Sequence, residues 1–155
     1  MKYLLVIVSI FLFTRPTNAN EFECLVEALY HEARSENDIG VLAVGTIILN
    51  RVKHKRFPNT ICRVVHQGYY WKTNPIRNKC QFSYWCDGKT EKYKNIKSLF
   101  RIILLAEMLW DGAAIASLNK ATHYHASYVR PMWSIKKQFK LITQKGRHLF
   151  YVDSR

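Results

Sequence analysis

The segment from Ile39 to Val52 restricts the fold more than any other part of the chain, because it is apolar on nearly every side. A helix of this kind is buried on all its faces, so we expect it to be the central helix of the domain. Ser35, Asn37 and Asp38 precede it and supply side chains that cap a helix start. The chain has 155 residues and no repeat or low-complexity tract, so one compact unit is expected.

Helical spacing of apolar residues predicts three further helices. In the last of them the apolar residues stand at positions 99, 100, 103, 104, 108 and 110, and Gly112 is expected to end it. The three predicted helices are Phe22 to Arg34, Ile61 to His66 and Ile96 to Trp110.

Alternating residues predict a short strand from Thr122 to His125 and a hairpin of Phe139–Thr143 and His148–Val152 with a glycine at its turn. Residues 68–79 are expected to form a polar and aromatic loop with little regular structure, and Gln81 to Trp85 a short extended segment. The predicted fold class is α+β with helices dominant. A lysozyme-like two-lobed domain, with a cleft between a helical part and a short sheet or hairpin, suits this order of elements.

Residues 1–19 have the three parts of a secretory signal peptide. Lys2 supplies the basic start, Leu4 to Phe13 the apolar stretch, and Thr17 to Ala19 a small-residue cleavage site. The apolar stretch has about ten residues, whereas a membrane-spanning helix needs about 20. We therefore expect export to the periplasm or cell wall, removal of residues 1–19 without a remaining membrane anchor, and a mature domain of residues 20–155. An uncleaved anchor is the alternative.

Four cysteines lie in the expected mature domain, namely Cys24, Cys62, Cys80 and Cys86. An even number of cysteines in an exported domain of this size predicts two disulfides. The sequence leaves all of the possible pairings open. Free buried thiols or a zinc site are the alternatives, although no two of these cysteines have the close spacing of a zinc knuckle.

The chain is strongly basic, with 24 Lys and Arg against 11 Asp and Glu and a formal net charge of +13. Removal of residues 1–19 takes away Lys2 and Arg15 and no acidic residue, so the excess persists in the mature domain. Outside the cytosol such a charge favours encounter with anionic cell-wall polymers over nucleic acid. We expect a monomer that docks on the wall through this surface and uses no cofactor.

Three kinds of catalytic site can be tested against the sequence. A Ser or Cys nucleophile is disfavoured, because the chain has no Gly-x-Ser-x-Gly elbow and no cysteine in a catalytic context. A zinc-dependent hydrolase would use His31, His123 and His125, which fall short of a complete ligand set. This hypothesis and that of a cationic, non-catalytic wall-binding module remain as alternatives to a glycosidase.

A glycosidase needs a carboxylic acid that stays protonated near neutral pH. Glu32 has a suitable position, because it continues the apolar stripe of Leu25, Ala28 and Leu29 on the first predicted helix. Burial there would raise the pKa of Glu32, whereas the acids of the capping turn 35–38 should stay ionised. A structural ion-pair partner is the other interpretation of Glu32.

Aromatic residues are frequent in the loops and short strands, where a sugar-binding cleft needs flat apolar faces. We place Trp133 among the residues that line such a groove. The His-x-His pattern is compatible with polar side chains at a cleft, so His125 is also a candidate for substrate contact.

Several ordered blocks of the chain together resemble the SleB-type cell wall hydrolases, the family named for spore-cortex-lytic enzymes. The resemblance extends from about Leu25 to Tyr151, with two departures: Ser35-Glu36 stands where the family commonly has Gly-Glu, and the loop 68–79 looks longer. The blocks are Tyr30 to Arg34, Val44 to Val52, Phe57 to Ile61, Gln81 to Ser83, Ala121 to Tyr124, Trp133, and Gly146 to Tyr151.

The resemblance implies a lysozyme-like fold and cleavage of peptidoglycan between N-acetylmuramic acid and N-acetylglucosamine. It also implies a single catalytic Glu, which corresponds to Glu32, and a cleft bordered by Gln81, Phe82, Ser83 and Tyr124. We therefore expect glycan-strand cleavage by a muramidase-like hydrolase or a lytic transglycosylase.

Overall fold

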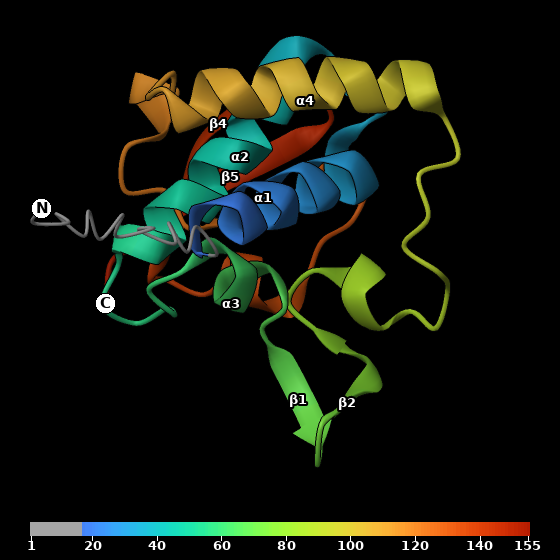
Figure 1. Cartoon of the computed structure of the whole chain (residues 1–155). Helices are drawn as coiled ribbons and strands as arrows, with labels where there is room; N and C mark the ends of the chain where they lie inside the picture. Colours follow the sequence, from blue (N-terminus) through green and yellow to red (C-terminus); the bar gives the residue numbers. More distant parts are fainter. Residues whose placement is uncertain (1–16) are drawn as a thin grey trace, which may run out of the picture.

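The computed structural model describes residues 17–155, so the expected signal peptide lies almost wholly outside the described residues. Helices form the largest share of the secondary structure in this part of the chain (Figure 1). No helix in it is both long and apolar enough to cross a membrane. The helices are α1 (Thr17–Ala33), α2 (Asp38–Lys53), α3 (Ile61–Val65) and α4 (Ile96–Trp110), with short 3-10 helices η1 (Ser83–Cys86), η2 (Ala116–Leu118) and η3 (Met132–Ile135).

The strands form two separate antiparallel units. A hairpin of β1 (Gly68–Trp71) and β2 (Asn74–Cys80) projects from the body of the molecule (Figure 1). A three-stranded sheet contains β3 (His123–Ala126), β4 (Phe139–Lys145) and β5 (His148–Asp153), with β5 in the centre. This arrangement confirms the predicted α+β class with helices dominant.

The central helix is α2, as its sequence predicts, and every residue from Gly40 to Ile48 is buried. It belongs to the main core together with α1, α3 and α4. Ala43 and Ile47 extend the core to the sheet through Phe150 of β5. α2 therefore joins the helical part of the molecule to its sheet.

Two local predictions are wrong. Residues 68–79 form most of the β1–β2 hairpin, not an irregular loop. Most of the hairpin is exposed, so its sequence lacks the apolar alternation of a half-buried strand. Residues 83–86 form η1 in place of an extended segment, and the Cys80–Cys86 disulfide closes the chain around it.

The helix α4 has the predicted bounds, but its buried face differs from the expected one. Ile102, Leu105, Ala106 and Leu109 are the residues it buries. The apolar residues at 100, 104, 108 and 110 are exposed instead. Because α4 carries apolar residues all round, spacing identified the helix without showing which side packs.

The prediction of two disulfides is confirmed. Cys24 pairs with Cys62, which follows it by 38 residues in the sequence, and this disulfide joins α1 to α3. Cys80 pairs with Cys86 and holds η1 against the end of β2. The second disulfide fixes the segment that lies beside Glu32.

Glu36 ties the turn between α1 and α2 to the β4–β5 turn. Its carboxylate accepts hydrogen bonds from the Arg147 side-chain Nε at 2.7 Å and from the Arg147 backbone amide at 2.9 Å. Burial alone would raise the pKa of Glu36, but these hydrogen bonds and the charges of His148 and Arg147 outweigh burial, so its pKa is lowered. Gly146 is needed here, because a Cβ at this position would overlap the Glu36 carboxylate.

The Glu36→Gln variant is expected to lose about 1–3 kcal/mol of unfolding free energy at neutral pH, since a buried acceptor to Arg147 loses its charge. An acid with a lowered folded-state pKa stabilises the fold above its unfolded pKa, and this contribution disappears as pH falls through the folded pKa. Urea unfolding should therefore show a lower unfolding free energy for the variant than for the wild type at neutral pH, and no difference at acid pH.

The Asp38→Asn variant serves as the control, because Asp38 is exposed and pairs with Arg101 at 2.8 Å. It should lose less than about 1 kcal/mol, as exposed ion pairs do. Equal losses in both variants would contradict the role given to Glu36.

Candidate active site

Glu32 lies in the last turn of α1, on the side that faces the core. Leu25, Ala28 and Leu29, which precede it on the same stripe, are fully buried. Glu32 itself is half-buried. The position predicted from helical spacing is therefore observed, and part of the residue remains open to solvent.

Groups from three other elements surround the Glu32 carboxyl. The Tyr124 hydroxyl, on β3, donates a hydrogen bond to Oε2 at 3.4 Å. The backbone amides of Ser83 and Tyr84, in η1, also act on the carboxyl by hydrogen bonding. Arg51, on α2, acts on it through its positive charge. The carboxyl thus lies where α1, α2, η1 and β3 meet.

Arg51 is held firmly although it is a cation in the core, where it is 5% exposed. Its Nε donates to the Thr122 carbonyl oxygen at 2.7 Å. Its guanidinium lies 5.2 Å from the ring centroids of both Phe57 and Phe82, which is the range of a cation–π contact. Its Nη1 has no hydrogen-bond partner among the described residues. Arg51 therefore offers a fixed positive charge near Glu32.

Burial is the largest influence on Glu32 and raises its pKa above the ordinary value. The hydrogen bonds from Tyr124, Tyr84 and Ser83 and the charge of Arg51 act in the opposite direction, because each favours the ionised form. The net pKa is raised, so the protonated form persists to higher pH than in an exposed glutamate. A carboxyl in this setting can donate a proton and then hold the negative charge that remains.

Tyr124 is fixed by the sheet. Its ring stacks on Phe150 at 5.8 Å and meets His148 edge-on at 5.2 Å. Burial, and then the negative charge of Glu32, raise the pKa of Tyr124 well above its usual value. The hydroxyl therefore stays protonated and remains a hydrogen-bond donor to Glu32.

The structure brings only part of the predicted cleft to Glu32. Ser83 and Tyr124 reach the carboxyl, and Gln81 is exposed just before η1. Phe82 is 1% exposed and lies under the Arg51 guanidinium, so its ring has no free face for a sugar. Its expected contact with substrate is replaced by a supporting contact with Arg51.

The structure does not bring His125 and Trp133 to Glu32. Side chains alternate along a strand, so His125 points to the face of β3 opposite Tyr124. There its Nε2 lies 2.9 Å from the Tyr151 hydroxyl, and its ring lies 5.5 Å from Trp133. His125 lines a separate cavity of about 400 Å³ on that face.

The three histidines of the zinc hypothesis lie in different surroundings. His31 stacks on Tyr84 at 5.0 Å, and its Nε2 is 3.2 Å from the Glu91 carbonyl oxygen. His123 lies 4.7 Å from Phe139 on the far side of the sheet, where burial lowers the pKa of His123 to about 4. Residues 17–155 contain no group of three or more His, Cys, Asp or Glu that could hold a metal ion.

Arg51 is the site residue that the sequence analysis missed, since no role was given to it within the segment from Ile39 to Val52. It continues the fully buried row of Val44, Ile47 and Ile48 at helical spacing. A charged residue on such a row was the signal that singled out Glu32. The same signal on α2 could have indicated Arg51 as the charged partner of Glu32.

Comparisons with known proteins identify the family. The family model described as Cell Wall Hydrolase matches residues 35–151, which is more than half of the chain. The chain belongs to the cell wall hydrolase family. The predicted family and class of enzyme are thereby confirmed. The match begins three residues after Glu32, so membership does not by itself assign a role to Glu32.

Curated relatives of this cell wall hydrolase include spore cortex-lytic enzymes. A stretch of 48 residues, 31% of the chain, is 40% identical to that enzyme from Bacillus cereus and covers 18% of its length. A stretch of the same length is 35% identical to the enzyme from Halalkalibacterium halodurans and covers 14% of it. The matched stretch thus spans less than a fifth of these relatives.

Two solved structures have a similar fold. The catalytic domain of the Bacillus cereus SleB protein superposes with a TM-score of 0.62 and 23% identity, covering 88% of this chain and 93% of that one. The catalytic domain of the germination-specific lytic transglycosylase SleB from Bacillus anthracis superposes with a TM-score of 0.63 and 24% identity. This match covers 88% of this chain and 98% of that one. At these identities the likeness supports the fold of this cell wall hydrolase.

The Glu32→Gln variant is expected to unfold at a higher temperature than the wild type at neutral pH. A raised folded-state pKa means that stability falls as pH rises from the ordinary pKa of a glutamate through the raised one. A glutamine at position 32 cannot ionise, so it avoids this loss of stability while it keeps the shape of the side chain. Thermal unfolding should show a gain near pH ~7 and none near pH ~3.5, where both side chains are neutral. A wild type more stable than the variant at neutral pH would contradict the raised pKa.

Proposed function

We propose that this cell wall hydrolase cleaves the glycan strands of peptidoglycan with Glu32 as its one catalytic carboxyl. The observation that carries the proposal is a half-buried carboxyl with a raised pKa, among groups that favour its ionised form. The similarity to spore cortex-lytic enzymes and to a lytic transglycosylase supports the substrate class.

In the first step the protonated Glu32 donates its proton to the glycosidic oxygen. The bond between that oxygen and C1 of N-acetylmuramic acid breaks, and N-acetylglucosamine leaves with the proton on its 4-hydroxyl. Positive charge develops on the muramyl ring as an oxocarbenium-like transition state. The Glu32 carboxylate that remains is stabilised by Tyr124, Arg51 and the η1 amides.

The second step depends on which nucleophile reaches C1. The charges that act most strongly on Glu32 include no second carboxylate among the described residues. A glycosidase that lacks this partner has no residue to activate water on the opposite face or to form a glycosyl-enzyme. We propose that the C6 hydroxyl of the same muramyl residue attacks C1 and gives its proton to Glu32. This forms a 1,6-anhydro product, restores the acid and consumes no water.

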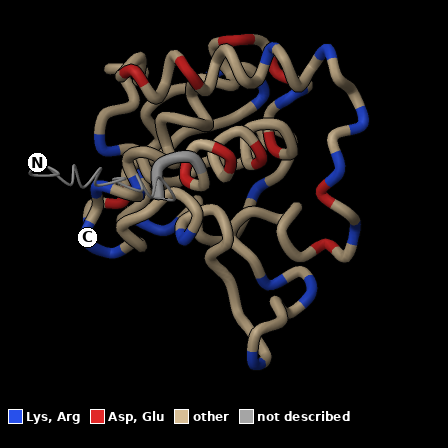
Figure 2. The backbone as a smooth tube through the Cα atoms, viewed as in Figure 1, with Lys and Arg blue, Asp and Glu red and all other residues tan. Residues whose placement is uncertain are grey.

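Outside the cytosol, the basic composition favours docking on anionic wall polymers. We propose that residues 1–19 direct export and that the mature domain docks on anionic wall polymers as a monomer. The cations are spread over several elements, including the loop before α4 and the tip of the β1–β2 hairpin (Figure 2). Such a distribution favours attraction to an extended polyanion.

The Glu32→Gln variant should lose at least about 10²-fold to 10⁴-fold in glycan cleavage, the contribution of general acid catalysis. Mass spectrometry of digested peptidoglycan measures the products. The wild type should release anhydro ends, and the variant almost none. The Glu23→Gln variant is the control, because Glu23 is exposed on the same helix. A Glu32→Gln rate within about tenfold of the wild type would refute the assignment.

The Tyr124→Phe variant removes a hydrogen bond to the ionised form of Glu32, so the pKa of Glu32 should rise further. A general acid is active while protonated, so the rate falls as pH rises through its pKa. The high-pH limb of the rate profile should therefore move to higher pH, and the maximum rate should fall because the developing carboxylate is less stabilised. A limb that stays in place or moves to lower pH would exclude this role for Tyr124.

A further inference from the structure

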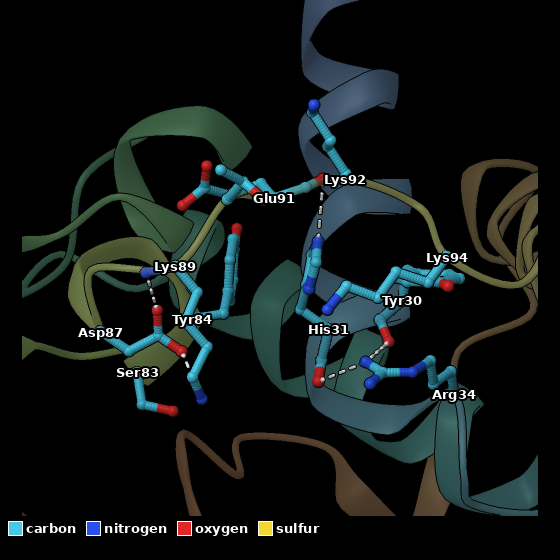
Figure 3. A pocket seen from close by; sticks show the side chains of 11 residues that line it. Tyr30, His31, Arg34, Ser83, Tyr84, Asp87, Lys89, Glu91, Lys92 and Lys94 are labelled. Carbon is cyan, nitrogen blue, oxygen red and sulfur yellow. Dashed lines mark hydrogen bonds and ion pairs between the residues drawn. The ribbon is translucent and has the colours of Figure 1, made fainter.

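A cavity of about 300 Å³ is lined by residues of α1, of η1 and of the loop before α4 (Figure 3). Tyr30 and His31 of α1, with Arg34 in the turn that follows this helix, form one side of it, and Ser83 and Tyr84 of η1 form another. The loop 87–95 closes it. The backbone amides of Ser83 and Tyr84 act on the Glu32 carboxyl, while both residues also line the cavity. The cavity and the Glu32 carboxyl therefore share Ser83 and Tyr84 as neighbours and lie close together.

The loop that closes the cavity is fixed to α1 at two points. The His31 Nε2 lies 3.2 Å from the Glu91 carbonyl oxygen, and the Asn95 amide donates to the Tyr30 hydroxyl at 2.8 Å. His31 also stacks on Tyr84 at 5.0 Å. These contacts give the cavity a defined shape.

The lining of the cavity is mainly cationic. Four cations, from Arg34 and from lysines of the loop, face two carboxylates. One of these carboxylates, Asp87, is already paired with Lys89 at 3.5 Å. No ion pair within residues 17–155 uses Arg34, Lys92 or Lys94. Three positive charges are thus available to an anion that enters.

We infer that this cavity binds the carboxylates of the stem peptide of peptidoglycan. The inference rests on the proposed function. Each stem peptide is attached to a muramyl residue and carries several carboxylates. A glycan bound at Glu32 therefore brings a tethered anion to the adjacent cavity at high effective concentration. The stacked rings of His31 and Tyr84 supply an apolar wall for the peptide backbone and its methyl groups.

A stem-peptide site makes the enzyme selective for glycan that carries peptides. The Lys92→Gln/Lys94→Gln double variant should lose about five- to tenfold in kcat/KM on peptide-bearing peptidoglycan, the effect of two exposed ion pairs. On the same glycan stripped of peptides by an amidase, the loss should be less than about twofold. The wild type should also prefer the peptide-bearing substrate.

The Lys136→Gln/Lys137→Gln variant is the matched control, because both lysines are exposed and lie outside the cavity. It makes the same change in net charge and should behave as the wild type on both substrates. Equal losses in the two double variants, or a Lys92/Lys94 loss that is the same on both glycans, would overturn the stem-peptide site. These outcomes would reject the stem-peptide site and leave the proposed catalytic role of Glu32 intact. Cleavage of stripped glycan by the Glu32→Gln variant would instead refute that catalytic role.

Phosphate-rich wall polymers offer the same anionic chemistry. Peptidoglycan freed of these polymers by acid, with its peptides retained, separates the two sources. The preference of the wild type and the loss in the double variant should both persist on this substrate. Their disappearance would assign the cavity to phosphate polymers and reject the stem peptide.

Discussion

The site depends on the burial of one carboxyl beside one buried cation. Glu32 and Arg51 belong to facing helices, and each occupies a position where its helix otherwise buries apolar side chains. Burial makes ionisation of Glu32 costly, while Arg51, Tyr124 and the η1 amides reduce that cost without removing it. The carboxyl is therefore a usable acid, and its conjugate base has fixed partners. Because the stabilising groups are held by packing, little reorganisation is needed when the charge appears.

The rest of the fold positions these groups. The apolar helix α2 carries Arg51 and contacts the sheet through Ala43 and Ile47, which fixes β3 and hence Tyr124 relative to the helices. The Cys80–Cys86 disulfide holds the segment that bears the η1 amides. The pair of Glu36 and Arg147 joins the helical part to the β4–β5 turn. These links hold different elements of the fold in place, so the geometry of the site depends on the packing of the whole domain.

Helical spacing of apolar residues predicted α1, α3 and α4, and the nearly all-round apolar character of residues 39–52 predicted α2. Helical spacing also located Glu32. It did not find the face of α4 that packs, since Phe100, Leu104 and Met108 are as apolar as the residues that are buried. The β1–β2 hairpin left no apolar alternation because it is mostly exposed. His125 and Trp133 were placed at the cleft by their chemistry alone, whereas the pleat of β3 directs only Tyr124 toward Glu32. Which face of a strand meets a distant helix is decided by tertiary packing, which neighbouring residues do not encode.

The most direct test of this account is an NMR titration of the Glu32 side-chain carboxyl carbon, assigned by its loss in Glu32→Gln. The account predicts a midpoint above the ordinary glutamate value of about 4.3. It also predicts a higher midpoint in Tyr124→Phe. A Glu32 midpoint at or below the ordinary value would show that Arg51, Tyr124 and the η1 amides outweigh burial. The carboxyl would then be ionised at neutral pH, and the acid role assigned to Glu32 would be contradicted.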